Sequence, residues 1–302
     1  MDNLLDILSP GELTALRLRA LFEQRGYRRY HPGRFEEYRF YLENQSFLKN
    51  ERFITFNDLD GRLMALKPDL TLSIVKNVDT AGGQKKLYYM ENVYRPNATG
   101  RNFTEISQMG LECLGRVGRA ETNEVVRLAY ESLKLTGEPF RLSLSHLRYL
   151  AGLMRNLRLP LHCRSALYEN IAAKNPHGLR EVAKAAGLSD EGTVMLEKAS
   201  MLSGAASEVL KEAKRLCRNA EMERAVAQLE QAIGGIDDPS VLIDFSIRGD
   251  EDYYSGLMLC GYLQGKSRIV LSGGEYDNMM KKMGQTGRAI GFAIYLDELC
   301  GR

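Results

Sequence analysis

The sequence predicts an α+β fold, in which a mostly antiparallel sheet is flanked by helices and interrupted by a helical insertion. Residues 87–115 have the pattern of a long hairpin, because two apolar and aromatic strands flank a polar loop that contains proline and glycine. Residues 146–235 instead carry Ala, Leu, Lys and Glu at helical spacing with interrupting glycines, which predicts about five short helices. Strand-like sequence returns after residue 240.

These patterns divide the chain into three parts. We expect residues 1–145 to form the first part of a core, residues 146–235 to form the helical insertion, and residues 236–302 to complete the core. A chain of 302 residues can bury a full hydrophobic core. The opposite charges of the insertion are interleaved, which fits solvated helix faces better than a binding tract.

The composition argues against several classes of function. The formal net charge is +2, with 41 basic and 39 acidic residues, so bulk electrostatics gives no reason to expect nucleic-acid binding. Five scattered cysteines without a C-x-x-C pair are expected to be reduced, and four histidines lack metal-ligand spacing. We therefore expect no metal and no cofactor. Without a basic leader or a run of ~20 apolar residues, the protein is expected in the cytoplasm and away from membranes.

The first predicted element is a helix. Ser9 has the properties of an N-cap, Pro10 follows at the first helical position, and Glu12 completes a capping box. Gly26 ends the apolar stripe that follows. Residues 27–41 are aromatic and basic, which suits a protein interface, although an ordinary amphipathic segment is equally consistent with them.

Two strands and a helix are expected next. Residues 53–56 and 62–66 should pair as a hairpin, because the Asp-Gly sequence between them favours a tight turn. Asp69 would then cap a helix over residues 70–77. This arrangement places Asp69 and Thr71 at a helix N-terminus beside the sheet, where capping and binding roles can coexist.

The second strand of the 87–115 hairpin has an unusual face. Because side chains alternate along a strand, Gln108, Gly110 and Glu112 share one face, with the two polar residues ~13 Å apart at the backbone. Buried Gln and Glu side chains need polar partners, and a glycine inside a strand allows close approach to the backbone. The pattern predicts a slot for a small polar molecule with Gly110 as its floor. It also fits an exposed face on which both polar side chains are solvated.

The remaining elements follow from the same kinds of pattern. Alternation places Asp244, Ser246 and Arg248 on the polar side of a strand. Gly273 and Gly274 follow another strand and allow backbone approaches that other residues forbid. The expected elements are a helix over 121–135, strands over 140–145, 241–247 and 268–271, and a last helix over 289–300.

Five blocks of sequence occur in an informative order: residues 67–71 (KPDLT), 94–112, 248–254 (RGDEDYY), 273–277 (GGEYD) and 289–294 (AIGFAI). Together they resemble the histidine branch of the class II aminoacyl-tRNA synthetases. The 94–112 block is similar to motif 2, the 248–254 and 273–277 blocks to the two histidine-specific signatures, and the last block to motif 3. The resemblance covers nearly the whole chain and implies a class II aminoacyl-tRNA synthetase-like catalytic core, with residues 27–41 as the dimer-forming motif 1.

The resemblance also implies a pocket for free histidine. Arg248 would face the ligand's carboxylate, because a guanidinium offers it a forked, charge-assisted contact. Arg95 belongs to the same expected pocket. The acceptors for the ammonium group would be Asp69, Thr71 and Gln108. The partners of the imidazole nitrogens would be Glu112 with Tyr253 or Tyr254.

Other positions depart from the synthetase pattern. Arg95 matches the motif 2 arginine that holds ATP phosphates, but Glu298 lies in the stretch that matches the motif 3 arginine, where a carboxylate would repel a triphosphate. Asn97 stands where motif 2 has a glutamate, Thr104 replaces a second arginine, and Glu275 replaces the arginine of the second histidine signature. We therefore expect no productive ATP site. Because the sequence stops directly after motif 3, we also expect no anticodon-binding domain.

A synthetase-like core with a histidine pocket but without the ATP arginines resembles the regulatory subunits of ATP phosphoribosyltransferase. That resemblance implies a non-catalytic protein that binds L-histidine and confers activation and feedback control on a separate ATP phosphoribosyltransferase catalytic subunit in histidine biosynthesis. It further implies a homodimer within a hetero-octamer. Two alternatives stay open: a truncated, histidine-activating class II ligase, and a dimeric scaffold with a vestigial pocket.

Overall fold

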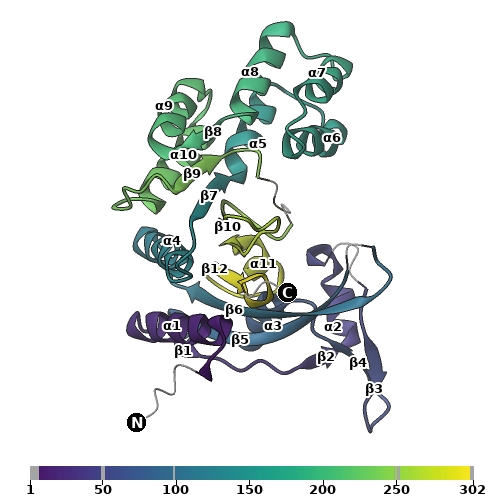
Figure 1. The fold of residues 1–302 in the computed structure, drawn as a ribbon. Coiled ribbons are helices and arrows are strands. Elements are labelled where there is room, and N and C mark those ends of the chain that lie inside the picture. The colour runs from purple at the N-terminus through teal and green to yellow at the C-terminus, as the bar shows by residue number, and fades with distance from the viewer. Residues whose placement is uncertain (1–6, 49–51, 98, 248, 250–251, 300–302) are drawn as a thin grey trace.

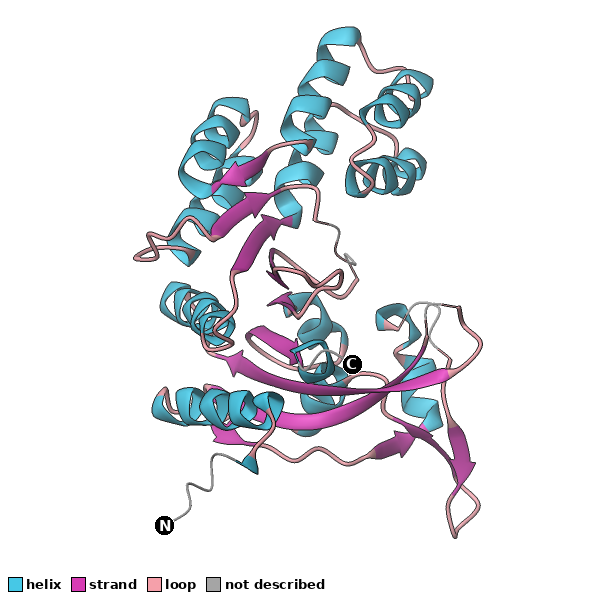
Figure 2. Ribbon diagram, viewed as in Figure 1, coloured by secondary structure: helices cyan, strands magenta, loops and turns pink. Residues whose placement is uncertain are grey.

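The computed structural model describes residues 7–48, 52–97, 99–247, 249 and 252–299 (Figure 1). Its main feature is a nine-stranded sheet that runs through most of the molecule, and Figure 2 shows these strands in magenta between the cyan helices. In spatial order the strands are β1 (Arg28–Arg29), β5 (Lys85–Pro96), β6 (Phe103–Gly115), β12 (Arg288–Tyr295), β11 (Leu271–Glu275), β10 (Leu257–Leu263), β7 (Phe140–His146), β9 (Val241–Asp244) and β8 (Ser203–Ala205).

Most neighbours in this sheet are antiparallel, and only the β1–β5 and β7–β9 pairs run parallel. A smaller antiparallel sheet contains, in spatial order, β2 (Phe35–Glu37), β4 (Leu63–Leu66) and β3 (Thr55–Asn57). The predicted α+β class with a mostly antiparallel sheet and flanking helices is therefore confirmed.

Helices before and after the central strands cover both faces of the sheet. They are α1 (Pro10–Gln24), α2 (Tyr38–Glu43), the 3₁₀ turn η2 (Gln45–Phe47), α3 (Leu70–Asn77), α4 (Arg119–Lys134), α11 (Asp277–Lys282) and α12 (Leu296–Leu299). The capping box of α1 is present as predicted, since the Ser9 side chain accepts from the backbone of Glu12 and the Glu12 carboxylate accepts from the backbone of Ser9.

Residues 147–232 contain six helices, one more than predicted. They are α5 (Leu147–Asn156), α6 (Leu161–Ala172), α7 (Pro176–Ala185), α8 (Asp190–Ser200), α9 (Ala206–Leu216) and α10 (Ala220–Ala232). The segment is not purely helical, because β8 pairs antiparallel with β9 and so extends the main sheet into it. Figure 1 shows these helices gathered at one end of the molecule, with α9 and α10 beside β8 and β9. Among the described residues, no helix has the length and apolar character needed to cross a membrane.

The hairpin of β5 and β6 is confirmed, and its alternation separates two hydrophobic cores. Met109, Leu111 and Cys113 of β6 join a core with residues of α1 and α4. On the other face, Tyr89 and Val93 of β5 join a second core with residues of α3 and α11. Because the even-numbered residues of β6 point to this second face, the fold directs Gln108 and Glu112 toward α3 and α11.

Three predicted elements are wrong in type or position. Residues 289–300 were expected to form a helix, but β12 occupies Arg288–Tyr295 and only α12 is helical. The apolar residues of β12 lie between β6 and β11 and are buried on both faces, so they lack the alternation that marks a half-buried strand. The expected strand over 268–271 is displaced to Leu271–Glu275, and Gly273 pairs with Phe292 inside the strand.

The third difference concerns the strand expected over residues 241–247, which ends at Asp244. The Asp244 carboxylate accepts hydrogen bonds from the backbone N–H and the hydroxyl of Ser246. This local Asx turn replaces the strand ladder.

Candidate functional site

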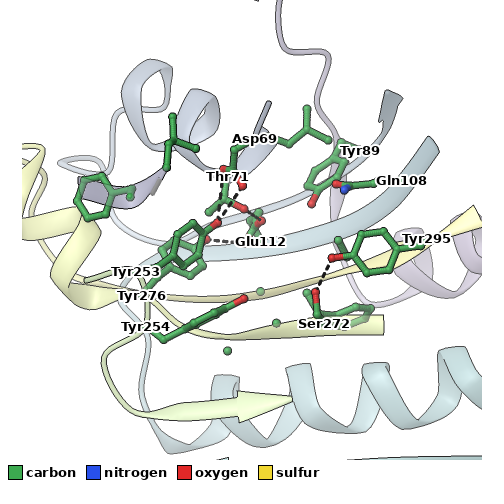
Figure 3. A pocket seen from close by; sticks show the side chains of 18 of the residues that line it. Asp69, Thr71, Tyr89, Gln108, Glu112, Tyr253, Tyr254, Ser272, Tyr276 and Tyr295 are labelled. Carbon is green, nitrogen blue, oxygen red and sulfur yellow. Dashed lines mark hydrogen bonds between the residues drawn. The ribbon is translucent and has the colours of Figure 1, made fainter. Parts of the chain in front are cut away.

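A small cavity opens where β6, β11 and β12 meet the start of α3, and Figure 3 shows its side chains. Its volume is about 220 Å³. Seven of the eight predicted histidine-binding residues line it: Asp69, Thr71, Arg95, Gln108, Glu112, Tyr253 and Tyr254. The eighth, Arg248, lies outside the described residues. Gln108 and Glu112 are only 4% and 1% exposed, so the alternative of a solvated sheet face is wrong.

Glu112 stands at the base of the cavity and uses both carboxylate oxygens. Thr71 Oγ1 donates to Oε1 at 2.8 Å, and the Tyr276 hydroxyl donates to Oε2 at 2.5 Å. Burial raises the pKa of Glu112 to about 8, although these two hydrogen bonds oppose the shift. The site therefore holds a carboxyl group that can change its protonation near neutral pH.

Asp69 combines the predicted capping role with a position on the cavity wall. Its Oδ1 accepts from the backbone N–H of Leu72 at 2.8 Å, which caps α3. Arg95 Nη2 lies 3.2 Å from Asp69 Oδ2, and the Tyr253 hydroxyl lies 3.4 Å from both carboxylate oxygens. An arginine, a carboxylate and a tyrosine thus converge at the N-terminus of α3.

The floor of the cavity differs from the prediction. A side chain at Gly110 would bring a Cβ within 2.5 Å of the Tyr89 hydroxyl and the Phe292 carbonyl oxygen. Tyr89 pairs with Gly110 across the hairpin and lines the cavity, so the glycine makes room for a tyrosine ring instead of a ligand. The slot between Gln108 and Glu112 therefore has an aromatic floor.

Sequence reasoning missed several residues of the site. Tyr89, Tyr276, Ser272 and Tyr295 line the cavity, and the Ser272 and Tyr295 hydroxyls lie 2.8 Å apart. Tyr276 belongs to the GGEYD block of residues 273–277. An aromatic residue opposite an interior strand glycine was the available signal for Tyr89, since such a ring can cover the exposed backbone of the glycine.

A second cavity of about 790 Å³ adjoins the first and shares Arg95 and Tyr295 with it. The departures from the synthetase pattern at Asn97, Thr104 and Glu298 line this second cavity. Glu298 lies 3.1 Å from Arg268, so the carboxylate already has a cationic partner.

The fourth departure from the synthetase pattern, Glu275, lines neither of these two cavities. It is 4% exposed, and its carboxylate lies 2.8 Å from the guanidinium of Arg288. Burial raises the pKa of Glu275, while Arg288 lowers it. The buried carboxylate is therefore paired with a partly exposed arginine.

The arrangement suits a small zwitterion with a polar side chain. Carboxylates at Asp69 and Glu112 can accept hydrogen bonds, Arg95 supplies a cation, and five tyrosines provide amphipathic walls. Within the part of the chain that the structure describes, no group of three or more His, Cys, Asp or Glu side chains is placed to hold a metal ion.

Solved structures share this fold. A protein from Bacillus halodurans described as an ATP phosphoribosyltransferase regulatory subunit/histidyl-tRNA synthetase has a TM-score of 0.85 at 23% identity, covering 96% of this chain and 78% of that one. Histidyl-tRNA synthetase from a Nostoc species has a TM-score of 0.80 at 18% identity, covering 97% and 72%. A chain of an ATP phosphoribosyl transferase (HisG:HisZ) complex from Thermotoga maritima has a TM-score of 0.73 at 18% identity, covering 95% and 97%. At these identities the likeness shows the fold alone.

Comparison with related sequences identifies the family of this chain. An ATP phosphoribosyltransferase regulatory subunit from Caldanaerobacter subterraneus subsp. tengcongensis is 29% identical over 94% of this chain and 76% of the relative. One from Moorella thermoacetica is 31% identical over 81% and 65%. The sequence model of the histidyl-tRNA synthetase family matches residues 11–299. The two relatives are ATP phosphoribosyltransferase regulatory subunits, and the chain itself belongs to the histidyl-tRNA synthetase family.

Proposed function

We propose that this chain is a non-catalytic regulatory subunit that binds L-histidine in the small cavity and controls a separate ATP phosphoribosyltransferase catalytic subunit. The observation that carries the proposal is the buried Glu112 in a polar, tyrosine-lined cavity, in a chain whose relatives over 94% of its length are named as such regulatory subunits. The proposal includes a role for this chain in histidine biosynthesis and a location in the cytoplasm.

The cavity's size supports an amino-acid ligand. Its volume of about 220 Å³ lies below the roughly 300–1,000 Å³ typical of pockets for drug-sized ligands. We assign the ammonium group to Asp69, Thr71 and Gln108, and the imidazole to Glu112 with the tyrosines. The ligand's carboxylate would pair with Arg248 or with Arg95, and Arg95 would then exchange part of its contact with Asp69 for the ligand.

The absence of adenylation belongs to the proposal as well. Glu298 and Arg268 form an ion pair in the adjoining cavity, so Arg268 is partly neutralised where a triphosphate would need positive charge. Regulation also requires that histidine favour one state of the assembly, and a coupling of about 1–3 kcal/mol would suffice. Assembly as a homodimer within a hetero-octamer is the arrangement expected from the family.

Calorimetry of the purified chain tests the ligand assignment. L-histidine and ATP are titrated in separate runs, and ATP is titrated again after saturation with histidine. We expect histidine to bind without ATP and ATP not to bind in either run. If neither compound bound, the histidine pocket would be rejected and the chain would be a scaffold with a vestigial pocket.

A pair of variants on one strand locates the binding event. Glu112→Ala should weaken histidine binding at least about tenfold, because it leaves buried donors and the ligand without their acceptor. Glu105→Ala removes an exposed carboxylate of β6 that does not line the small cavity, and should bind histidine like the parent chain. If Glu112→Ala and Glu105→Ala bound histidine with equal affinity, the ligand would bind outside the small cavity.

A second candidate function is a histidine-activating ligase. The adjoining cavity favours it, because about 790 Å³ is large enough for a nucleotide and Arg95 borders both cavities. Binding of ATP in the calorimetric runs, together with histidine-dependent exchange of pyrophosphate into ATP, would make this candidate the leading one.

A further inference from the structure

Two walls of the small cavity are carried by one short loop, residues 252–256, which we call the tyrosine loop. Tyr253 and Tyr254 point into the cavity, as Figure 3 shows. Neither ring is on a helix or strand, so the loop's own contacts must fix their positions. Inside the cavity the Tyr253 hydroxyl lies 3.4 Å from the Asp69 carboxylate, and further contacts hold the backbone of the loop.

Two other parts of the chain form hydrogen bonds with the loop at Ser255, which is 5% exposed. From the helical segment, Arg148 Nε donates to the Ser255 carbonyl oxygen at 2.8 Å. From the core, the backbone N–H of Asp277 donates to Ser255 Oγ at 2.9 Å. The backbone N–H of Leu147 also donates to the Gly256 carbonyl oxygen at 3.0 Å. The first turn of α5 therefore makes two direct contacts with the tyrosine loop.

The position of this first turn is itself fixed from within the helical segment. His146 caps α5, and its Nδ1 accepts from the backbone N–H of Arg148. Its Nε2 lies 2.8 Å from Gln228 Oε1 on α10, and the ring is 1% exposed. A continuous set of hydrogen bonds thus runs from α10 through His146 and Arg148 to the loop that forms the cavity wall.

We propose that Arg148 is a positioning residue for the ligand cavity, and that ligand binding there is coupled to the α5–α10 segment through the tyrosine loop. The coupling rests on the histidine-binding function proposed above, whereas the positioning role does not. Because the contact is made by a discrete hydrogen bond, losing it should loosen the loop and weaken binding without altering any cavity-lining residue.

The chain offers a matched pair of variants on one helix. Arg148 is exposed overall, so Arg148→Met removes the donor without leaving a buried charge unpaired. Arg155→Met is the control, because Arg155 is also an exposed arginine of α5 but donates to Glu221 of α10 at 3.1 Å and not to the loop. Arg148→Lys keeps a cationic donor and should restore much of the parent behaviour.

Hydrogen exchange of the ligand-free chains tests positioning first. The backbone N–H of Ser255 and that of Leu257 are bonded to Glu275, and their exchange should become faster in Arg148→Met but not in Arg155→Met. Equal exchange in the two variants would overturn the positioning role, whether or not histidine binds.

The coupling is tested by repeating both measurements with L-histidine. Histidine should slow exchange over residues 147–156 of the parent chain, and Arg148→Met should bind it about three- to tenfold more weakly than Arg155→Met. Unchanged affinity in Arg148→Met, or unchanged exchange in α5 of a histidine-bound parent chain, would overturn the coupling. If no chain bound histidine while Arg148→Met loosened the loop, the proposed function and the coupling would fail and the positioning role would stand.

Discussion

Glu112 is a buried acidic residue of the small cavity, and its surroundings raise its pKa. Among the described residues its hydrogen-bond partners are Thr71 and Tyr276, which are neutral, so these two contacts do not offset the cost of burying its charge with a positive one. The nearby carboxylate of Asp69 raises its pKa further. A buried acid of this kind is costly for the fold, which is typical of a group retained for binding.

The titration of Glu112 should make stability depend on pH. Glutamate has a reference pKa of 4.5, and burial raises the pKa of Glu112 in the folded chain to about 8. Between these values the folded chain holds a proton that the unfolded chain has released, so stability falls as the pH rises through this window. Compared with Glu112→Gln, the parent chain should lose about 1–4 kcal/mol of unfolding free energy across it.

Denaturant unfolding of both chains at several pH values measures this difference. The variant is the proper reference, because an amide of similar shape cannot ionise while the other titrating groups are retained. Parallel pH profiles for the two chains would mean that Glu112 does not titrate in this range.

At the scale of elements, the site depends on close packing between β6 and β12. Gly291 of β12 pairs with Glu112, and a Cβ at Gly291 would lie within hard contact of the Glu112 carboxylate. The glycine therefore lets the buried carboxylate lie flat against the neighbouring strand. Gly110 makes the equivalent room for Tyr89 on the other side of β6.

Gly291→Ala should displace the Glu112 carboxylate and abolish most histidine binding. We expect at least a tenfold loss of affinity and about 1–3 kcal/mol of destabilisation, because a methyl group is forced into filled space. Calorimetry and thermal unfolding measure the two effects.

Gly82→Ala provides the control for a glycine substitution as such. Its added Cβ would meet only Lys85 Nζ at 3.7 Å, an ordinary contact, and should leave binding unchanged. If Gly291→Ala bound histidine as well as the parent chain, the Glu112 carboxylate would not need the space beside Gly291, and this prediction would be wrong.

The sequence predicted elements well where local signals were strong. The capping box at Ser9, the Asp69 cap and the long hairpin all depend on neighbouring residues. The strand β12 was mistaken for a helix, because a central strand buried on both faces shows an unbroken apolar run. The residues of the small cavity were found through the family resemblance, whereas periodicity alone left the exposed-face alternative open.

Contacts between distant parts of the chain could not be predicted in this way. Arg148 and Ser255 are 107 positions apart, and nothing in their local sequence pairs them. The same holds for Tyr276 and Glu112, which are 164 positions apart. Such contacts exist because the nine-stranded sheet places β6, β12, β11, β10 and β7 in successive positions.

For the whole molecule, the central question is whether a ligand in the small cavity alters a partner. The cavity lies in the core of the sheet, while β8 and β9 continue that sheet into the α5–α10 segment. A shared sheet and the tyrosine loop give the two regions a physical connection. The proposed regulatory function would need such a connection if the ligand and the partner bind at different places.

The most direct measurement is the rate of phosphoribosyl transfer to ATP by a short-form catalytic subunit. The rate is compared for that subunit alone, with this chain, and with its Glu112→Ala variant, each with and without L-histidine. The account predicts that the parent chain raises the rate and that histidine lowers it, whereas the complex with Glu112→Ala is active but resists histidine. Equal inhibition of both complexes would contradict it, because the histidine that controls the enzyme would then bind outside this cavity.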